Sequence, residues 1–386
     1  MRIGIDNIST GEATGLQGPG GMRMYLQSLL SWFSKLAQQN EYILFTPDWA
    51  DSLQDEYPPN LKVVKLFGVP KNRTARIFYQ QTALPLALAY HRLDVYFATA
   101  TVAPLLAPMP VVLAVQFIQF YESPEAYGFF RTNYLKLILP LSLEKARQVI
   151  IFTESSKRDL VRWTGISATR VNVVPHGLAQ DIECIPDLQG NKSALVKNLS
   201  LTNGRPYILY VSATYGYKNH KRLIQAFGHM KKRWNFPQVL LLVGSEVTVT
   251  YAELREVAES VGVADDVIFA GRLDPHEKVT ETYVNADLAV IPTLYETFGF
   301  PALEAMACGC PVVTSNCGSM AELAGDAAIL VDPYDPESIS NGMAQMLHDS
   351  ELRYSLIERG RKHALSYTWK RSAEQTLQIL EQVAQR

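Results

Sequence analysis

Two glutamates flank a predicted turn in PTLYETFGFPALEAMACGCPVVTS, residues 292–315. Glu296 precedes the Phe298-Gly299-Phe300 break and Glu304 follows it. A carboxylate accepts two hydrogen bonds at once, so Glu304 suits the paired hydroxyls of a ribose, and Glu296 suits the hydroxyls of a group attached beyond it. Two glutamates beside a helix start can also be solvated or capping residues, and their spacing alone leaves both interpretations open.

A strand, a turn and a helix are expected to position these carboxylates. The apolar run 288–293 has the length of a strand, and Pro301 suits the first helical position because it needs no hydrogen-bond donor there. Residues 302–308 then continue as a helix. The N–H groups at Gly299, Phe300 and the first helical turn favour an anion such as a diphosphate. The stretch therefore predicts a site for a phosphorylated ligand rich in hydroxyls.

A glycine-rich loop near the N-terminus is a second candidate binding element. It covers residues 7–21, includes Gly20 and Gly21, and lies between the apolar start of the chain and a predicted amphipathic helix beginning at Met22. Strand, glycine loop and helix together let the backbone approach a ligand closely. The glycine spacing fits neither the dinucleotide fingerprint nor a phosphate-binding P-loop, and an ordinary loop is the alternative.

Strand-sized apolar runs alternate with helical patterns along the chain, which predicts parallel, doubly wound sheets. The strand candidates are residues 42–46, 61–66, 95–99, 111–116, 149–152, 171–174, 207–212, 239–243, 267–270, 288–293 and 328–331. We expect an N-terminal Rossmann-like domain at 1–180, a polar linker at 181–206 and a C-terminal domain at 207–368. The last helix, 369–386, packs either back on the first domain or on the second.

Composition excludes several classes of protein. The chain has 386 residues and a formal net charge of -2, so it lacks the basic excess typical of nucleic-acid partners. Its four cysteines do not have metal-ligand spacing, no Asp-x-Asp motif is present, and we expect neither a metal nor another cofactor. The first residues of the sequence have no signal-peptide pattern, so we expect the protein to be located in the cytoplasm. Residues 95–121 are uncharged, but three prolines favour two buried strands over a membrane helix.

Several motifs in this chain resemble those of the retaining family-four glycosyltransferases, whose group 1 members have the GT-B fold of two facing Rossmann-like domains with a deep cleft. ETFGFPALEAMACGCPVVTS is similar to their E-x7-E signature. The other matching stretches are GPGGMRMYLQSLL, NVVPHGL, LYVSATYGYKNHKRLIQAF, VIFAGRL, GDAAILVDPYD and YTWKRSAEQ. The resemblance covers nearly the whole chain.

The resemblance implies roles for individual residues. Lys218 would neutralise the diphosphate leaving group and Glu296 would contact the donor sugar, which makes them the catalytic candidates. The donor-binding candidates are Gly20, Gly21, Arg272 at the base, Thr297, Phe298, Gly299 and Phe300 at the phosphate and sugar, and Glu304 at the ribose.

The sequence departs from the family pattern in two places. Ser212-Ala213-Thr214 occupies the region where many members carry an arginine before the lysine, and His220, Lys221 or Arg222 would have to replace it. Gln116-Phe117 stands where the family usually has His-Asp, so Gln116 could contact a sugar or acceptor hydroxyl without acting as a general base.

We predict a retaining, metal-independent hexosyltransferase with a nucleotide-sugar donor of the GDP-mannose or UDP-glucose type. Its acceptor would be a glycan or a lipid-linked molecule. The alternatives are a nucleotide-sugar epimerase of the same fold and a catalytically impaired donor-binding protein. Residues 129–141 mix aromatic, cationic and apolar side chains, which suits either weak peripheral contact with a membrane at its inner face or an ordinary core-packing helix.

Overall fold

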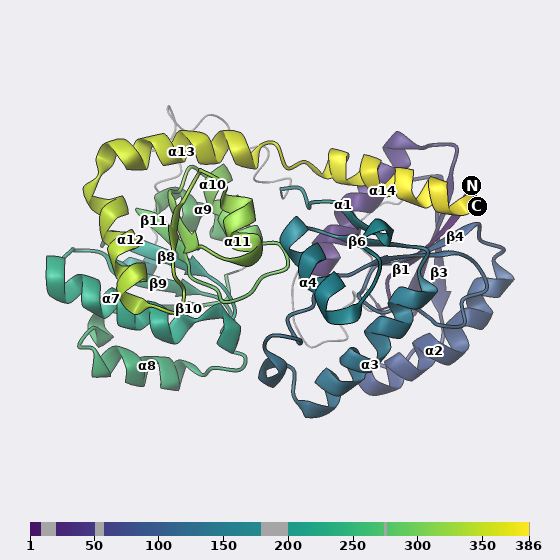
Figure 1. Ribbon diagram of the computed structural model, residues 1–386, viewed down its shortest axis with the longest axis horizontal. Helices are drawn as coiled ribbons and strands as arrows, with labels where there is room; N and C mark the ends of the chain where they lie inside the picture. The colour runs from purple at the N-terminus through teal and green to yellow at the C-terminus, as the bar shows by residue number, and fades with distance from the viewer. Residues whose placement is uncertain (9–20, 51–57, 179–199, 274–275, 386) are drawn as a thin grey trace. The chain divides into compact units, whose positions relative to one another are not determined.

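The computed structural model describes residues 1–8, 21–50, 58–178, 200–273 and 276–385. The chain divides into two compact units (Figure 1). Unit 1 comprises Met1–Gly177 together with Thr368–Arg386, and unit 2 comprises Leu178–Tyr367. Most of the predicted linker, residues 181–199, lies outside the described residues, and its last part carries a short 3-10 turn at Ser200–Thr202.

Unit 1 contains a seven-stranded parallel sheet in the order β3-β2-β1-β4-β5-β6-β7. Its strands are β1 (Arg2–Asp6), β2 (Glu41–Pro47), β3 (Leu61–Leu66), β4 (Val95–Ala98), β5 (Val111–Ala114), β6 (Gln148–Ile151) and β7 (Val171–Val173). Every residue of β4 and β5 is buried, as expected for central strands of a sheet covered on both faces. The uncharged segment 95–121 therefore forms two strands and their connections, as predicted.

The helices of unit 1 cover both faces of this sheet. They are α1 (Gly21–Leu36), α2 (Arg73–Tyr90), α3 (Phe129–Lys145), α4 (Glu154–Thr164) and α14 (Trp369–Ala384). The chain moves in one direction across the sheet from β1 to β3 and in the other from β4 to β7. Because parallel crossovers are right-handed, α1 lies on one face, and α2, α3 and α4 lie on the other.

The C-terminal helix α14 packs on the α1 side of the unit 1 sheet, against α1, β4, β5 and β6. It buries Trp369, Leu377 and Leu380 among other residues. Trp369 contacts the ring of Tyr25 on α1, with their centroids 5.9 Å apart. A Cβ atom at Gly177 would collide with the backbone of Trp369, so glycine permits the close approach of these two segments. The sequence pattern left the position of this helix open, and tertiary packing places it on unit 1.

Unit 2 contains a six-stranded parallel sheet in the order β10-β9-β8-β11-β12-β13. Its strands are β8 (Tyr207–Val211), β9 (Val239–Val243), β10 (Val267–Gly271), β11 (Leu288–Ile291), β12 (Val312–Ser315) and β13 (Ile329–Val331). Its helices are α7 (His220–Trp234), α8 (Tyr251–Ser260), α9 (His276–Asn285), α10 (Phe300–Ala307), α11 (Gly318–Ala324), α12 (Pro336–His348) and α13 (Ser350–Ala364). Each strand candidate corresponds to a strand, whereas α11 was not predicted.

The direction of chain crossing reverses between β8 and β11, which are neighbours in the sheet of unit 2. In doubly wound sheets, ligands bind outside the carboxyl ends of the strands at such a point, because the two following loops diverge there. The loops after β8 and β11 contain the predicted catalytic residues. The predicted architecture of two doubly wound parallel-sheet domains is confirmed, and the cleft between them stays a prediction.

Candidate active site

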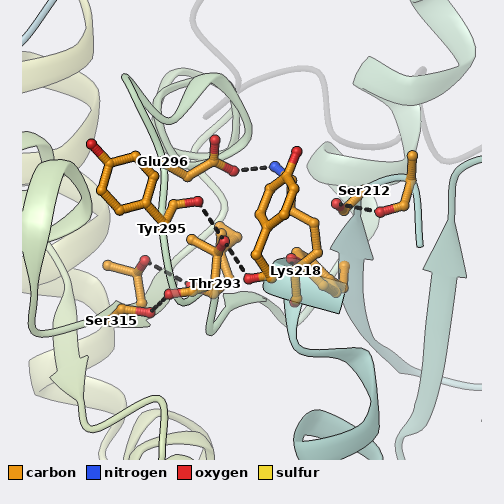
Figure 2. A network of polar contacts seen from close by, with 11 residues as sticks. Ser212, Lys218, Thr293, Tyr295, Glu296 and Ser315 are labelled. Carbon is orange, nitrogen blue, oxygen red and sulfur yellow. Dashed lines mark hydrogen bonds and ion pairs between the residues drawn. The ribbon is translucent and has the colours of Figure 1, made fainter. Parts of the chain in front are cut away.

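The side chains of Lys218 and Glu296 meet at this switch point in unit 2. Lys218 follows β8 and Glu296 follows β11, and their ammonium and carboxylate groups form a short ion pair (Figure 2). The two side chains are only 14% and 11% exposed. Sequence reasoning gave each residue a separate role, whereas the structure brings the two charges together. A buried charge is costly without a partner, so each group stabilises the other.

Hydrogen bonds between the two loops hold this ion pair in position. The N–H of Leu294 donates to the carbonyl oxygen of Tyr217 at 2.8 Å, and the hydroxyl of Thr293 lies 3.1 Å from the same oxygen. Behind them, the hydroxyl of Ser315 on β12 donates to the carbonyl of Thr293 at 2.6 Å. The two loops are thus fixed to each other next to Lys218, and Figure 2 shows Thr293 and Ser315 near the ion pair.

Asn219 is a site residue that sequence reasoning missed. It has a left-handed backbone conformation, φ 66°, at the junction between the lysine loop and α7. Its side-chain amide donates to the carbonyls of Pro292 at 2.9 Å and Pro333 at 2.7 Å. Asn tolerates this conformation better than most residues, so an Asn immediately before a helix was the available signal. Asn219 connects the lysine loop both to the end of β11 and to the segment after β13.

Of the three residues proposed to replace the missing arginine, one is neutral and the other two have partners of their own. Burial, reinforced by the charge of Lys218, lowers the pKa of His220 to about 3, so its ring is neutral at physiological pH. Lys221 pairs with Glu253 on α8 at 2.8 Å. The guanidinium of Arg222 donates to the side-chain oxygen of Asn219 at 3.0 Å. Lys218 is the cation of this loop that pairs with Glu296, and Arg222 contacts the loop through Asn219.

The turn before α10 has the backbone geometry that a close ligand approach requires. Gly299 has φ 119° and is the N-cap residue of α10, with Pro301 in the first turn. A side chain at Gly299 would be strained by this φ and would collide with Met320. Thr297 and Phe298 are buried, and the carbonyl of Thr297 accepts a hydrogen bond from Ser319 at 3.3 Å. The hydrogen bond from Ser319 and the burial of Thr297 and Phe298 therefore fix the turn, and α10 starts at the end of the turn.

Glu304 lies in the buried part of α10 and is only 7% exposed. Glutamate is seldom buried to this extent without a specific reason, which argues against the simple solvated interpretation. Phe300 packs near the ring of Phe298, with centroids 5.1 Å apart. Glu296 thus precedes the turn, and Glu304 lies one helical turn into α10 after it.

The other predicted donor-binding residues lie at different positions. Arg272 is exposed and directly follows β10, two strands away from β8, which corresponds to about 10 Å across the sheet. Gly21 is exposed at the first position of α1 in unit 1. Gly20 lies outside the described residues.

Gln116 follows β5 at the carboxyl edge of the unit 1 sheet. Its backbone N–H and that of Phe117 both point to the hydroxyl oxygen of Thr101, at 3.1 and 3.4 Å. Thr101 has φ 68°, an unusual conformation for a β-branched residue and one that often marks a functional site. The buried amide nitrogen of Gln116 has no hydrogen-bond partner among the described residues. A ligand hydroxyl would satisfy it.

Solved structures with the same fold show which class of protein this architecture defines. Sucrose-phosphate synthase from Thermosynechococcus elongatus superposes with a TM-score of 0.76 at 23% identity, covering 99% of this chain and 98% of that one. Anabaena HepE, solved in complex with UDP and glucose, superposes with a TM-score of 0.75 at 19% identity, covering 99% and 100%. These similarities place the two units in the GT-B fold class.

Sequence comparisons narrow the class to a family. The profile of Glycosyltransferase Family 4 matches residues 19–181, and that of Glycosyl transferases group 1 matches residues 191–363. The O-antigen chain mannosyltransferase B of Escherichia coli is 30% identical over 269 residues, which cover 67% of each protein. The D-inositol 3-phosphate glycosyltransferase of Acidothermus cellulolyticus is 29% identical, covering 61% of this chain and 53% of that protein. The chain belongs to the group 1 glycosyltransferases, and it spans about half to two thirds of the length of these curated relatives.

Proposed function

We propose that this protein is a retaining hexosyltransferase that moves a sugar from a nucleotide-sugar to a hydroxyl of a glycan or a lipid-linked acceptor. The observation that carries the proposal is the Lys218–Glu296 pair, held at the switch point of unit 2 by two interlocked loops. A donor of the GDP-mannose or UDP-glucose type fits the names of a mannosyltransferase relative and of a structural neighbour solved with UDP and glucose.

The paired charges suggest how the donor is recognised. The diphosphate would take the ammonium of Lys218 as its counter-charge, and the carboxylate of Glu296 would then accept hydrogen bonds from hydroxyls of the transferred sugar. The N–H groups of the 297–300 turn would bind phosphate and sugar, and Glu304 would bind the ribose. Arg272 would reach the base from the end of β10, and Gly20 and Gly21 complete the proposed set of donor-binding residues.

The proposed chemistry is substitution on one face of the sugar. The bond between the anomeric carbon and the diphosphate oxygen breaks, and the acceptor oxygen attacks from the same face as the leaving group. The departing phosphate receives the acceptor proton, so the leaving group ends as the protonated nucleoside diphosphate. Lys218 and the start of α10 stabilise the charge that develops on the diphosphate, which removes the need for a metal ion in this proposal.

A thermal-shift panel followed by a transfer assay tests the proposal. A nucleotide or nucleotide-sugar that binds the native state raises the unfolding midpoint, and differences across UDP, GDP and ADP forms identify the base. The matching nucleotide-sugar is then incubated with glycan and lipid-linked acceptors, and the anomeric configuration of the product is read by NMR. Transfer with retained configuration supports the proposal, whereas an inverted product contradicts the mechanism.

Two outcomes would favour the alternative functions. Isomerised or free sugar formed without an acceptor would identify an epimerase of the same fold. Nucleotide-sugar binding without turnover against a broad acceptor panel would identify an impaired donor-binding protein. This second alternative is based on position 116, where the family usually has a histidine and this chain has a glutamine.

A further inference from the structure

Helix α3 exposes large apolar side chains along its outer surface. Phe129 and Phe130 at its start are 77% and 88% exposed, and Leu137 further along is 68% exposed. The opposite side of the helix buries Leu135, Ile138, Leu139 and Leu143. The helix therefore packs its inner face into the core of unit 1, and it also presents an apolar outer face, where charged residues are the usual choice.

Helix α2 has an outer face of the same kind. Its exposed residues recur at helical spacing and include no charged side chain among those described: Ala75, Phe78, Thr82, Leu86, Ala89 and Tyr90. Phe78, Leu86 and Tyr90 are 71%, 75% and 84% exposed. Exposed apolar residues scattered singly are normal, but a continuous row along a helix is not.

The outer faces of α2 and α3 belong to one surface. The loop between β4 and β5 links the two helices, because the carbonyl of Ala103 accepts from Gln81 on α2 at 3.1 Å and its N–H donates to Ser142 on α3 at 3.2 Å. Leu106 in this loop is 73% exposed. Both helices lie on the face of the sheet opposite α1 and α14 (Figure 1). We call this surface the α2/α3 face, made of Phe78, Leu86, Tyr90, Leu106, Phe129, Phe130, Leu137 and Leu141.

The charges around the α2/α3 face are predominantly positive. Residues 71–92, which contain α2, include no acidic residue, and Lys71 and Arg92 at the two ends of this segment are exposed, whereas Arg76 is buried. Helix α3 contains Arg131, Lys136 and Lys145 against one acidic residue, Glu144, and the 3-10 turn Pro124–Ala126 that contacts α3 adds the exposed Glu125. Aromatic and aliphatic side chains flanked by cations are what an amphipathic surface needs to bind the headgroup region of an anionic bilayer.

We propose that the α2/α3 face docks unit 1 on the surface of a bilayer containing anionic lipids. Phe129 and Phe130 would enter the boundary between headgroups and acyl chains, and Lys71, Arg92 and Lys136 would lie among the phosphates. The proposed binding is peripheral. No described helix is long and apolar enough to cross a membrane. It does not depend on the proposed transferase activity and can be measured without any sugar substrate.

Flotation of the full-length protein with phospholipid vesicles tests the inference. We expect the wild type to float with vesicles of phosphatidylcholine plus phosphatidylglycerol, to float less with phosphatidylcholine alone, and to dissociate partly at high salt. Phe129→Ser combined with Phe130→Ser should weaken binding by about tenfold or more, because two buried rings are lost. Lys136→Glu should weaken binding by about fivefold and reduce its dependence on phosphatidylglycerol.

Matched variants in unit 2 separate this face from general surface effects. Tyr354→Ser combined with Leu365→Ser removes two similarly exposed apolar side chains, and Lys232→Glu makes the same charge change on α7. Neither should alter vesicle binding, and unfolding midpoints confirm that all variants fold. The inference is overturned if the wild type does not float or if the double Phe variant binds like the wild type. It is also overturned if the face instead forms a dimer in solution that the double Phe variant abolishes.

Discussion

The sheets of units 1 and 2 share the same order over six strands but differ in the chemistry at their carboxyl edges. In unit 2 the loops after β8 and β11 present a lysine and a glutamate that are almost fully buried and paired. In unit 1 the loops after the neighbouring strands β4 and β5 present Thr101 and the uncharged amide of Gln116, whereas most of the loop after β1, which corresponds to the loop after β8, lies outside the described residues. This difference agrees with the proposal that unit 2 binds the charged part of the donor and that the described loops of unit 1 meet a ligand hydroxyl.

Helix α7 of unit 2 and helix α2 of unit 1 differ in the charge of their exposed residues. In unit 2, the exposed positions of α7 include Lys221, His229, Lys232 and Arg233. In unit 1, the exposed positions of α2 are uncharged wherever their side chains are described. The exposed face of α7 is thus charged, whereas the described exposed face of α2 is apolar.

If unit 2 recognises charge, removing the Lys218 ammonium should have the largest effect. Lys218→Met combined with Glu296→Gln replaces the ion pair by neutral groups and avoids stranding a buried carboxylate. We expect kcat/KM for transfer to fall by about 100- to 1000-fold, roughly 2.7–4 kcal/mol, as for loss of one group that stabilises developing negative charge. Lys221→Met, which removes the neighbouring cation, is the control and should stay near wild type. Wild-type rates in the double variant would remove Lys218 from the mechanism.

Loss of the Glu304 carboxylate should weaken binding of the donor more than it slows the transfer step. Glu304→Gln keeps the size of the side chain and removes its charge, at a cost of about 1.5–3 kcal/mol if it accepts hydrogen bonds from ribose hydroxyls. We expect the KM for the nucleotide-sugar to rise by roughly 10- to 100-fold at nearly constant kcat. Glu337→Gln, an exposed glutamate on α12, provides the comparison. A lower kcat at unchanged KM would contradict a ribose role.

The buried ring beside Lys218 should make unit 2 sensitive to acid. The pKa of His220 is about 3 in the folded protein and about 6.5 when unfolded, so the unfolded state binds more protons between these values. The free energy of unfolding is therefore not reduced by this ring above pH 6.5. It falls as the pH falls below 6.5, by about 2 kcal/mol at pH 5.

Urea unfolding at pH 7 and pH 5 measures this effect of acid. His220→Asn should reduce the loss of stability between the two pH values by about 2 kcal/mol. His229→Asn, which changes an exposed histidine of the same helix, should keep the wild-type dependence. Equal pH dependence in all three proteins would show that the His220 ring is not held neutral.

Substitution of Gln116 should have the smallest effect on activity. This effect should be confined to kcat/KM for the acceptor. Gln116→Ala removes a neutral hydrogen-bonding group, which costs about 0.5–1.5 kcal/mol, or roughly two- to tenfold in kcat/KM for the acceptor. The thermal shift produced by the nucleotide should not change. A lost nucleotide shift would mean that unit 1 also binds the charged part of the donor, and the contrast between the units would then be wrong.

Much of the fold could be predicted because its signals are local. The fully buried strands β4, β5, β9 and β11 are short apolar runs, and their alternation with helical patterns dictates a parallel sheet. The turn at Phe298-Gly299-Phe300 was also predictable, since Gly and Pro constrain the backbone whatever surrounds them. The same local signals placed Glu296 before this turn and Glu304 in the helix that follows it.

Other features depend on contacts between residues far apart in the sequence, and only the tertiary structure decided them. Lys218 and Glu296 are 78 positions apart, and their pairing requires β8 and β11 to be adjacent in the sheet. The neutral ring of His220 and the two carbonyl partners of Asn219 likewise depend on what packs around α7.

The sequence by itself determined the two doubly wound units, the family and the candidate residues of the donor site. The tertiary structure decided which charges are paired, which unit holds α14 and which side chains of α2 and α3 remain exposed. The physical reason is that backbone preferences and periodicity act over a few residues, whereas burial and electrostatic pairing depend on neighbours that only folding brings together.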